Sequence, residues 1–164
     1  MTPDRDLTLT RIVVRRAALS EPMRLAWAIR AADSWLGPEA GDPAIPGGRR
    51  HAADLKLRAD DGPTLLTFHK AAYVDLGPVR ETDEGWEVEI GWRASSFAPL
   101  FPVFSGAIVA RAGELTLSGK YAPPGGAIGR AADRALLHIA AEGTARWLLA
   151  RLDEAAALGG ATSG

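Results

Sequence analysis

The last part of the chain carries one long helical pattern, and this feature constrains the fold most. Apolar residues recur every three or four positions between Ile128 and Leu158, and no proline interrupts them. A helix of this length, roughly 30 residues, measures about 45 Å. Such a helix needs a broad apolar surface along its stripe, so the preceding residues are expected to supply one. The stripe residues are Ile128, Ala132, Ala135, Leu136, Ile139, Gly143, Trp147 and Ala150.

The residues before this helix read as a series of β-strands. The clearest alternation places Trp86, Val88, Ile90 and Trp92 on one face of a strand and charged residues on the other. Short turns rich in glycine separate most of the segments, which is typical of antiparallel hairpins. The expected strands cover residues 7–19, 51–59, 64–74, 86–93, 103–111 and 114–121. Such a sheet has one apolar face, and the long helix is its natural cover.

One short helix is predicted between the first two strands. Ser20 is a candidate N-cap, and Glu21 and Pro22 suit a first helical turn, so we expect a helix over residues 21–31. A further turn is expected at 33–36. Four glycines and three prolines within 37–48 predict a loop there. Gly159 and Gly160 are expected to end the long helix.

Size and charge exclude several classes of protein. The 164 residues form one domain, 1–164, with 1–6 and 159–164 as frayed tails. Nineteen basic residues against 20 acidic ones leave a net charge of −1, which argues against a nucleic-acid partner.

No cysteine is present, and the three histidines lack metal-binding spacing, so neither a metal nor another cofactor is expected. No segment has the apolar length of a membrane span or a secretory signal, which predicts a cytoplasmic protein. The oligomeric state is left open.

The junction between the last strand and the long helix carries a family resemblance. Residues 117–130 read LSGKYAPPGGAIGR, with a Gly-x-Tyr strand end followed by a Pro-Pro-x-Gly turn. This junction resembles bacterial helix-grip domains of the START-like superfamily, also called SRPBCC, which includes polyketide cyclases and plant-allergen-like lipid carriers. The order of elements is similar over nearly the whole chain. The second short helix usual in such domains falls at 37–48, which is poor helix material.

The resemblance implies an α+β helix-grip fold, in which a curved antiparallel sheet of about six strands wraps around the C-terminal helix. It also implies an apolar cavity between the sheet and the helix. The expected function is therefore binding of a small hydrophobic or amphipathic molecule. A cyclase or dehydratase in the same cavity is the alternative, with His69 or Tyr73 as general acid or base. A protein-interaction module without a pocket is the third reading, with an exposed patch along 97–104.

The candidate ligand-binding residues come from strand phase and aromatic content. If Lys70 faces water, His69 and Tyr73 face the cavity; the opposite phase, with Leu66, Phe68 and Val74 inside, also makes a good core. The aromatic residues read either as a cavity wall or as ordinary core. His51 and His138 are expected at a rim and on a solvated helix face. The candidates are His69, Tyr73, Trp86, Trp92, Phe97, Phe101, Ile139 and Gly143.

Overall fold

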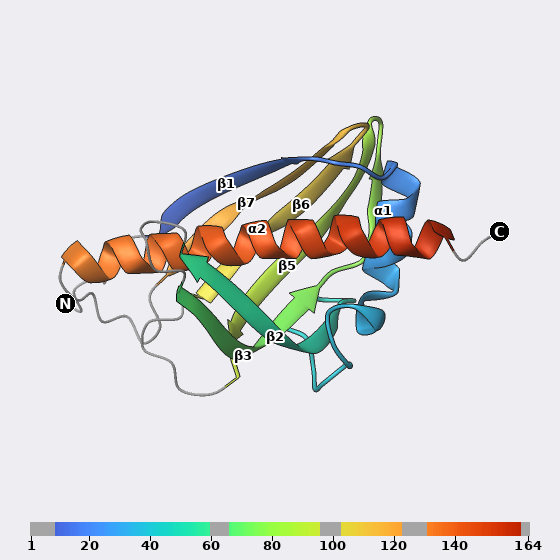
Figure 1. Ribbon diagram of the computed structural model, residues 1–164. Helices are drawn as coiled ribbons and strands as arrows, with labels where there is room; N and C mark the ends of the chain where they lie inside the picture. The colour runs from blue at the N-terminus through green and yellow to red at the C-terminus, as the bar shows by residue number, and fades with distance from the viewer. Residues whose placement is uncertain (1–8, 60–65, 96–102, 123–130, 162–164) are drawn as a thin grey trace, which may run out of the picture.

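The computed structural model describes residues 9–59, 66–95, 103–122 and 131–161, with side chains for all of these except 56–59, 66–70, 131–136 and 160–161. A curved antiparallel sheet of seven strands encloses the long C-terminal helix, α2 (Ala131–Ala161) (Figure 1). The strands are β1 (Thr10–Ala17), β2 (Arg49–Ala59), β3 (Leu66–Leu76), β4 (Arg80–Thr82), β5 (Gly85–Ala94), β6 (Val103–Arg111) and β7 (Glu114–Ala122). The α+β helix-grip architecture expected from the sequence is confirmed.

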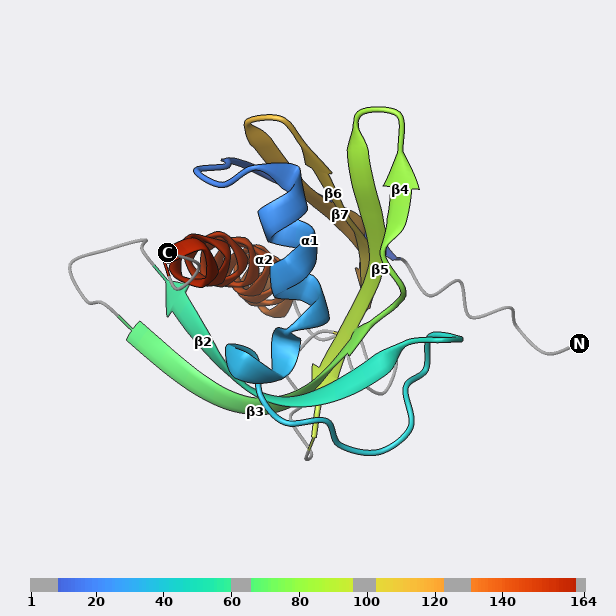
Figure 2. The ribbon, with the colours of Figure 1, turned by 90° about the vertical axis from the view of Figure 1, so that its right-hand side faces the viewer.

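The sheet order is β1-β7-β6-β5-β3-β2, with the short β4 paired to β5 outside this path. Helix α2 contacts both edge strands, β1 and β2, and also β7. The short helix α1 (Pro22–Arg30) contacts α2, β5 and β6. Figure 2 looks along α2 and shows α1 standing between α2 and β5. One end of the concave face is therefore covered by α1, while α2 runs on past it toward the far end of the sheet.

The alternation of buried and exposed side chains along the strands explains which residues form the core. On β5, Trp86, Val88, Ile90 and Trp92 are all buried, whereas Glu89 and Arg93 are exposed. Helix α2 faces these side chains with a matching inner stripe, because residues three or four positions apart share one helix face. That stripe is Leu137, Ala141, Ala145, Leu148, Leu152 and Ala156. The core is thus one continuous apolar layer between sheet and helices.

The loop after α1 lies along the free edge of β2. A 3-10 turn (Ala32–Ser34) follows the helix. The amide of Ala40 then donates to the Arg50 carbonyl (2.8 Å), and the amide of Ala52 donates to the Pro38 carbonyl (2.9 Å). At Gly37 a Cβ would collide with the Ala52 carbonyl oxygen, so this close approach requires glycine. The expectation of a loop rather than a second helix is confirmed.

Three local predictions differ from the structure. Strand β4 was not predicted, because its three residues are all exposed and carry no burial pattern. Helix α2 continues through Gly159 and Gly160 to Ala161, so these glycines do not end it and 159–161 is not a frayed tail. A Cβ at Gly159 would meet the Trp27 ring, so the glycine is explained by close packing against α1. The Ser20 side chain does not cap α1; Glu21 occupies the N-cap position.

The phase predicted for β3 is reversed. Ala72, Val74 and Leu76 are buried, whereas Ala71 is exposed and Tyr73 is half-buried on the opposite face. The prediction relied on Lys70 alone, and the apolar residues of the strand decide the phase instead. No helix among the described residues has the length and hydropathy needed to cross a membrane. The expected tail at 1–6 lies outside those residues.

Candidate functional site

One row of side chains crosses the concave face of the sheet. The strand registers pair His51 with Val74, Val74 with Trp92, Trp92 with Phe104, and Phe104 with Tyr121. Residues paired in this way across neighbouring strands point to the same face of a sheet. All five side chains are buried. We call this set the concave row.

Two aromatic rings form the centre of the concave row. The Trp92 and Phe104 rings stack, with 4.0 Å between their centroids and 14° between their planes. A Cβ at Gly106 would lie 2.7 Å from the Phe104 ring tip, and one at Gly119 would lie 2.5 Å from it. These two glycines are paired on β6 and β7, so together they make the bare floor on which the Phe104 ring lies. The result is a flat aromatic surface facing α2.

Two polar atoms in the concave row are buried without a hydrogen-bond partner among the described residues. They are Nε2 of His51 and Nε1 of Trp92. His51 is 0% exposed and Trp92 is 2% exposed. Nδ1 of His51 lies 2.8 Å from the Gly37 carbonyl oxygen. Leaving a buried polar atom unpaired costs about 1–3 kcal/mol, so two such atoms in one row require an explanation.

A chain of three polar side chains begins at the other end of the row. The hydroxyl of Tyr121 lies 3.1 Å from Nδ1 of His138, and Nε2 of His138 lies 3.3 Å from a carboxylate oxygen of Glu142. A carboxylate only accepts, so in the neutral ring Nε2 donates to Glu142 and Tyr121 donates to Nδ1. Tyr121 is buried, while His138 and Glu142 are partly exposed on α2. This chain, Tyr121–His138–Glu142, connects the concave face to the surface.

Burial is the main reason that the pKa of Tyr121 is raised above its usual 10.0. A hydrogen bond with the Thr10 hydroxyl acts in the opposite direction, and the negative charge of Glu142 reinforces the rise. The phenol is therefore held in its protonated form at neutral pH, as a hydrogen-bond donor. Because its one hydrogen is donated to His138, the phenol offers its oxygen to a bound molecule, as a hydrogen-bond acceptor.

The part of α2 that roofs the concave face changes in character along its length. Leu148, Leu149 and Leu152 are fully buried in the half near α1. In the earlier half, Ile139 and Gly143 are only half-buried, although Ala141 between them is fully buried. Ile139 and Gly143 therefore lie off the inner stripe, on another side of the helix from Ala141.

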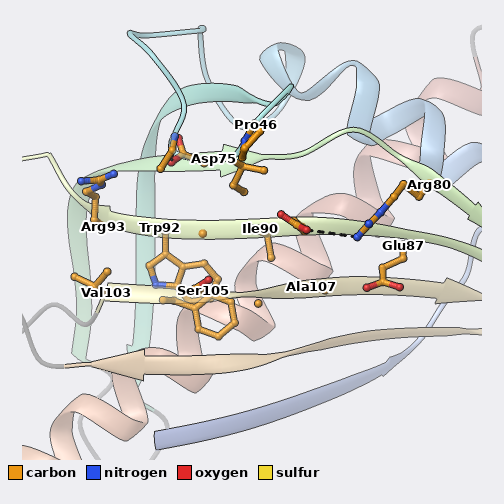
Figure 3. A pocket seen from close by; sticks show the side chains of 16 residues that line it. Pro46, Asp75, Arg80, Glu87, Ile90, Trp92, Arg93, Val103, Ser105 and Ala107 are labelled. Atoms are coloured by element: carbon orange, nitrogen blue, oxygen red, sulfur yellow. Dashed lines mark hydrogen bonds and ion pairs between the residues drawn. The ribbon is translucent and has the colours of Figure 1, made fainter. Parts of the chain in front are cut away.

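The convex face of the sheet carries a separate, open groove of about 750 Å³. Its wall is the loop around Pro46, and its floor is β5 and β6 (Figure 3). Asp75 anchors this wall: its carboxylate accepts from Arg50 (2.7 and 3.0 Å) and from the Ala44 amide (3.2 Å). Burial by itself would raise the pKa of Asp75, but the Arg50 and Ala44 hydrogen bonds and nearby arginine charges lower it overall. Arg80 and Glu89 add an exposed ion pair at 3.5 Å.

The structure separates the residues that the sequence placed together. Tyr73 lies on the convex face, where the Arg50 guanidinium sits 5.1 Å from its ring centre, so the prediction that it faces the cavity is wrong. Trp86 and Trp92 both face the concave side, but Trp86 lies under α1 and donates to the Pro22 carbonyl at 2.6 Å. Ile139 and Gly143 are half-buried and lie off the inner stripe of α2, so the prediction that they belong to the stripe facing the core is wrong.

The remaining candidates fall outside what the structure describes. Phe97 and Phe101 lie outside the described residues, and the side chain of His69 is not described. Most of the patch predicted along 97–104 also lies outside them, and its last residue, Phe104, is buried rather than exposed. These predictions therefore stay predictions, except for Phe104.

The roles of two histidines were missed by the sequence reasoning. His51 was expected at a rim, but it is fully buried. His138 is partly exposed, as expected, but its ring also contacts the Tyr121 hydroxyl. The spacing of His138 and Glu142, four positions apart on one helix, was the available signal for that pair. No local signal marks His51, because its place depends on strand register.

Comparison with known proteins gives similarity in structure without similarity in sequence. No family model matches the chain, and no curated protein matches it. TTHA0849 from Thermus thermophilus matches with a TM-score of 0.54 and 13% identity, over 94% of this chain and 100% of that one. Zhui aromatase/cyclase from Streptomyces sp. R1128 matches with a TM-score of 0.52 and 15% identity, over 90% of this chain and 93% of that one.

A third similar structure is the di-domain ARO/CYC BexL from the BE-7585A biosynthetic pathway. It matches with a TM-score of 0.53 and 12% identity, over 90% of this chain and 50% of that one. This chain therefore corresponds to about half of the di-domain protein. At these identities the likeness concerns the fold alone, and it agrees with the helix-grip architecture described above.

Proposed function

We propose that this helix-grip protein binds a small apolar or amphipathic molecule between the concave row and α2. The observation that carries the proposal is the pair of buried polar atoms, on His51 and Trp92, that have no hydrogen-bond partner within the described part of the chain. A bound molecule would give these atoms partners and cover the aromatic surface. Each Å² of apolar surface removed from water contributes about 25 cal/mol, so such a site binds with few polar contacts.

The fold supports the same proposal. Two of the structures with this fold are named as aromatase/cyclase proteins, which act on small molecules. One fold can host many functions, so this likeness favours a function in small-molecule binding, and the proposal itself rests on the residues of the site.

The first experiment is native mass spectrometry on the protein as purified, followed by solvent extraction of any bound molecule. A co-purified apolar molecule would support the proposal and identify its chemical class. The protein is then incubated with lipids and with flat aromatic compounds. If only the mass of the bare chain appears under all of these conditions, the proposal is overturned.

A variant of α2 locates the site. Ala141 is fully buried on the inner stripe, and Ala157 is exposed on the same helix, so Ala141→Phe is tested against Ala157→Phe as its matched control. If a ligand space lies under Ala141, the new ring fills it, and binding falls while the free energy of unfolding changes little. If the core there is full, Ala141→Phe destabilises the fold by about 1–3 kcal/mol through overpacking.

A second candidate function, an enzyme of the cyclase or dehydratase kind, is favoured by the chain Tyr121–His138–Glu142. The chain starts at a buried phenol whose hydrogen is donated to His138, which is the geometry of a general base: the phenol oxygen would take a proton from the bound molecule while its own proton moves to His138 Nδ1, beside the Glu142 carboxylate. These residues replace Tyr73 as the acid–base candidate. The test compares the wild type with Tyr121→Phe for conversion of a bound molecule, followed by mass spectrometry. Binding that persists while conversion is lost would support this function; equal conversion would remove Tyr121 from it.

A further inference from the structure

Exposed apolar side chains gather at the end of the molecule where α1 meets the end of α2. Leu19 lies shortly before α1 and is 85% exposed, and Met23 in the first turn of the helix is 83% exposed. Trp27, one turn later, is 51% exposed, and Leu158 near the end of α2 is 65% exposed. Figure 2 shows this end of the molecule, with α1 and the end of α2 toward the viewer. We call these four residues the end patch.

Contact between the two helices makes the end patch continuous. A Cβ at Gly159 would collide with the Trp27 ring, so the ring lies against the backbone of α2, next to Leu158 in the sequence. Met23 and Trp27 are four positions apart and share one face of α1. The Trp27 ring is therefore held in place by α2 while about half of its surface stays exposed. Tryptophan held in this way is the residue type most often found at the centre of protein interfaces.

The core does not require these residues. Helix α1 packs inward with the side chains of Leu25, Ala28 and Ile29, which are all buried on the opposite face of the helix. Four of the seven large apolar side chains that are exposed in the described part of the chain belong to the end patch. Single exposed apolar residues are normal on a protein surface, whereas a continuous group of them marks an interaction site.

The charges at the two ends of α1 indicate which partner fits. Glu21 occupies the N-cap, and Arg30 is the last residue of the helix. Both side chains are exposed, and neither has an ion-pair partner among the residues that the structure describes. If two copies of α1 pack side by side in opposite directions, Glu21 of each copy comes beside Arg30 of the other. The same arrangement brings Met23 of each copy opposite Trp27 of the other, and it places helix ends of opposite partial charge together.

We infer that the end patch joins two copies of this chain into a symmetric dimer, in which their α1 helices pack antiparallel. A twofold interface uses the same patch on both copies, so the patch must be complementary to itself. The end patch meets this condition, because apolar side chains meet at its centre and opposite charges meet at its rim. A membrane surface fits less well, since a rim of mixed sign is only weakly attracted to anionic lipids. The inference goes beyond the proposed function, because the end patch shares no residue with the concave row.

Sedimentation velocity of the wild type tests for the dimer. The protein is measured from roughly 1 to 300 μM, a range that brackets the dissociation constants expected of a small interface. We expect the monomer to be replaced by a dimer as the concentration rises. A wild type that stays monomeric over the whole range would overturn the inference.

Two variants test whether the end patch forms the interface. Met23→Glu and Leu158→Glu each place a charge in the patch, one on each helix, and each is expected to weaken the dimer about tenfold or more. Both positions are largely exposed, so the fold is retained. Leu9→Glu is the matched control, because Leu9 is also half-exposed but lies at the start of β1, away from α1. A dimer that all three variants leave equally stable would use another surface, and the inference would fail.

Charge reversal tests the antiparallel arrangement. Glu21→Arg and Arg30→Glu, each made alone, place like charges side by side and should weaken the dimer about threefold or more. The double variant restores opposite charges and should dimerise within about twofold of the wild type. Circular dichroism of each variant checks that α1 is still helical. If the double variant dimerises no better than the two single variants, the helices do not pack antiparallel and the inference is overturned.

Vesicles provide the test of the competing partner. The wild type and Met23→Glu are sedimented with vesicles of phosphatidylcholine and phosphatidylglycerol. We expect neither protein to sediment with them. Binding by a monomeric wild type that Met23→Glu abolishes would assign the end patch to a membrane surface and would overturn the dimer.

Discussion

The two faces of the sheet differ in whether their buried polar groups have hydrogen-bond partners among the described residues. On the convex face, the buried carboxylate of Asp75 accepts three hydrogen bonds, two from Arg50 and one from the Ala44 amide. On the concave face, His51 and Trp92 each bury a polar atom that has no partner among the described residues. The same strands carry both faces, since Asp75 follows Val74 directly on β3.

This difference shows that the fold is able to satisfy buried polar groups close to the concave row. Asp75 on β3 is paired with Arg50 on β2 and with the amide of Ala44 in the loop before β2, so three segments meet at this carboxylate. Comparable pairing is absent for His51 Nε2 and Trp92 Nε1 within the described part of the chain, although both lie within two strands of Asp75. A polar group with a purely structural role is expected to be paired, and under the proposed function His51 and Trp92 would take their partners from a bound molecule.

The largest change in the free energy of unfolding is expected on the convex face, where the buried carboxylate has its partners. Asp75→Ala should destabilise the fold by about 3 kcal/mol, because it leaves Arg50 and the Ala44 amide without their acceptor. The pKa of Asp75 is lowered in the folded state, so its stabilising effect is present above about pH 4 and is lost as the pH falls through the folded-state pKa. Urea unfolding at pH 7 and pH 3 measures both effects.

Glu81 is exposed on β4, so Glu81→Ala is the control and should change the free energy of unfolding by less than about 0.5 kcal/mol. An Asp75→Ala variant as stable as this control would remove the contrast between the two faces.

A smaller effect is expected from the floor beneath the aromatic stack. In Gly119→Ala the new methyl group would meet the Ser105 carbonyl oxygen and would lie 2.5 Å from the Phe104 ring tip, so both the neighbouring backbone and the ring must shift. We expect destabilisation of about 2 kcal/mol, together with a change in the near-ultraviolet circular dichroism of the stacked rings. Gly113→Ala has open space but a positive φ, so it serves as a control for backbone strain without ring displacement. An unchanged aromatic signal in Gly119→Ala would contradict the stacking argument.

Trp86 and Trp92 lie on the same strand, β5, so their variants compare a paired with an unpaired buried N–H group. Trp86→Phe removes an N–H group that is bonded to the Pro22 carbonyl, and Trp92→Phe removes one that has no partner among the described residues. Both changes delete the same atoms from buried sites. Trp86→Phe should therefore be the more destabilising of the two by about 1 kcal/mol in chemical unfolding. Equal costs would indicate that Trp92 Nε1 has a partner after all.

The smallest effect concerns Tyr121 at alkaline pH. Its pKa is raised in the folded state, so its favourable effect on folding is complete below about pH 10 and is lost as the pH rises through the folded-state pKa. Tyr121→Phe should lose less stability between pH 9 and pH 11 than the wild type, as measured by thermal unfolding. Tyr73→Phe, on the convex face, is the matched control. Parallel alkaline profiles for the wild type and Tyr121→Phe would argue against a buried phenol.

The order of the elements was predictable because burial on one face leaves a period of two in a strand and of about 3.6 in a helix. The bounds predicted for β6 agree with the structure, and most other strands were placed within a few residues. Strand β4 has no buried face, so it left no pattern. The phase of β3 failed because one lysine was weighted above Val74 and Leu76, which the structure buries.

The candidate site was less predictable than the fold. Trp92 was found because its residue type and its place in the alternation mark an inner face, whereas Ile139 and Gly143 were assigned to a helix stripe that the structure leaves half-buried. His51 joins Trp92 only through the registers of two strand pairs, and Tyr121 meets His138 only where α2 crosses β7. Register and crossing are set by long-range packing, and no short stretch of sequence encodes them.

The pairing of the first strand with the last has a consequence for how the chain is made. Thr10 on β1 pairs with Tyr121 on β7, so β1 leaves the ribosome long before its partner is synthesised. Closing so long a loop is slow, and an unpaired strand is a site for aggregation while it waits. Translation that stops before Glu114 leaves β1 with no strand to pair with. Until the final third of the chain has emerged, β1 is therefore an unprotected strand that other chains can pair with.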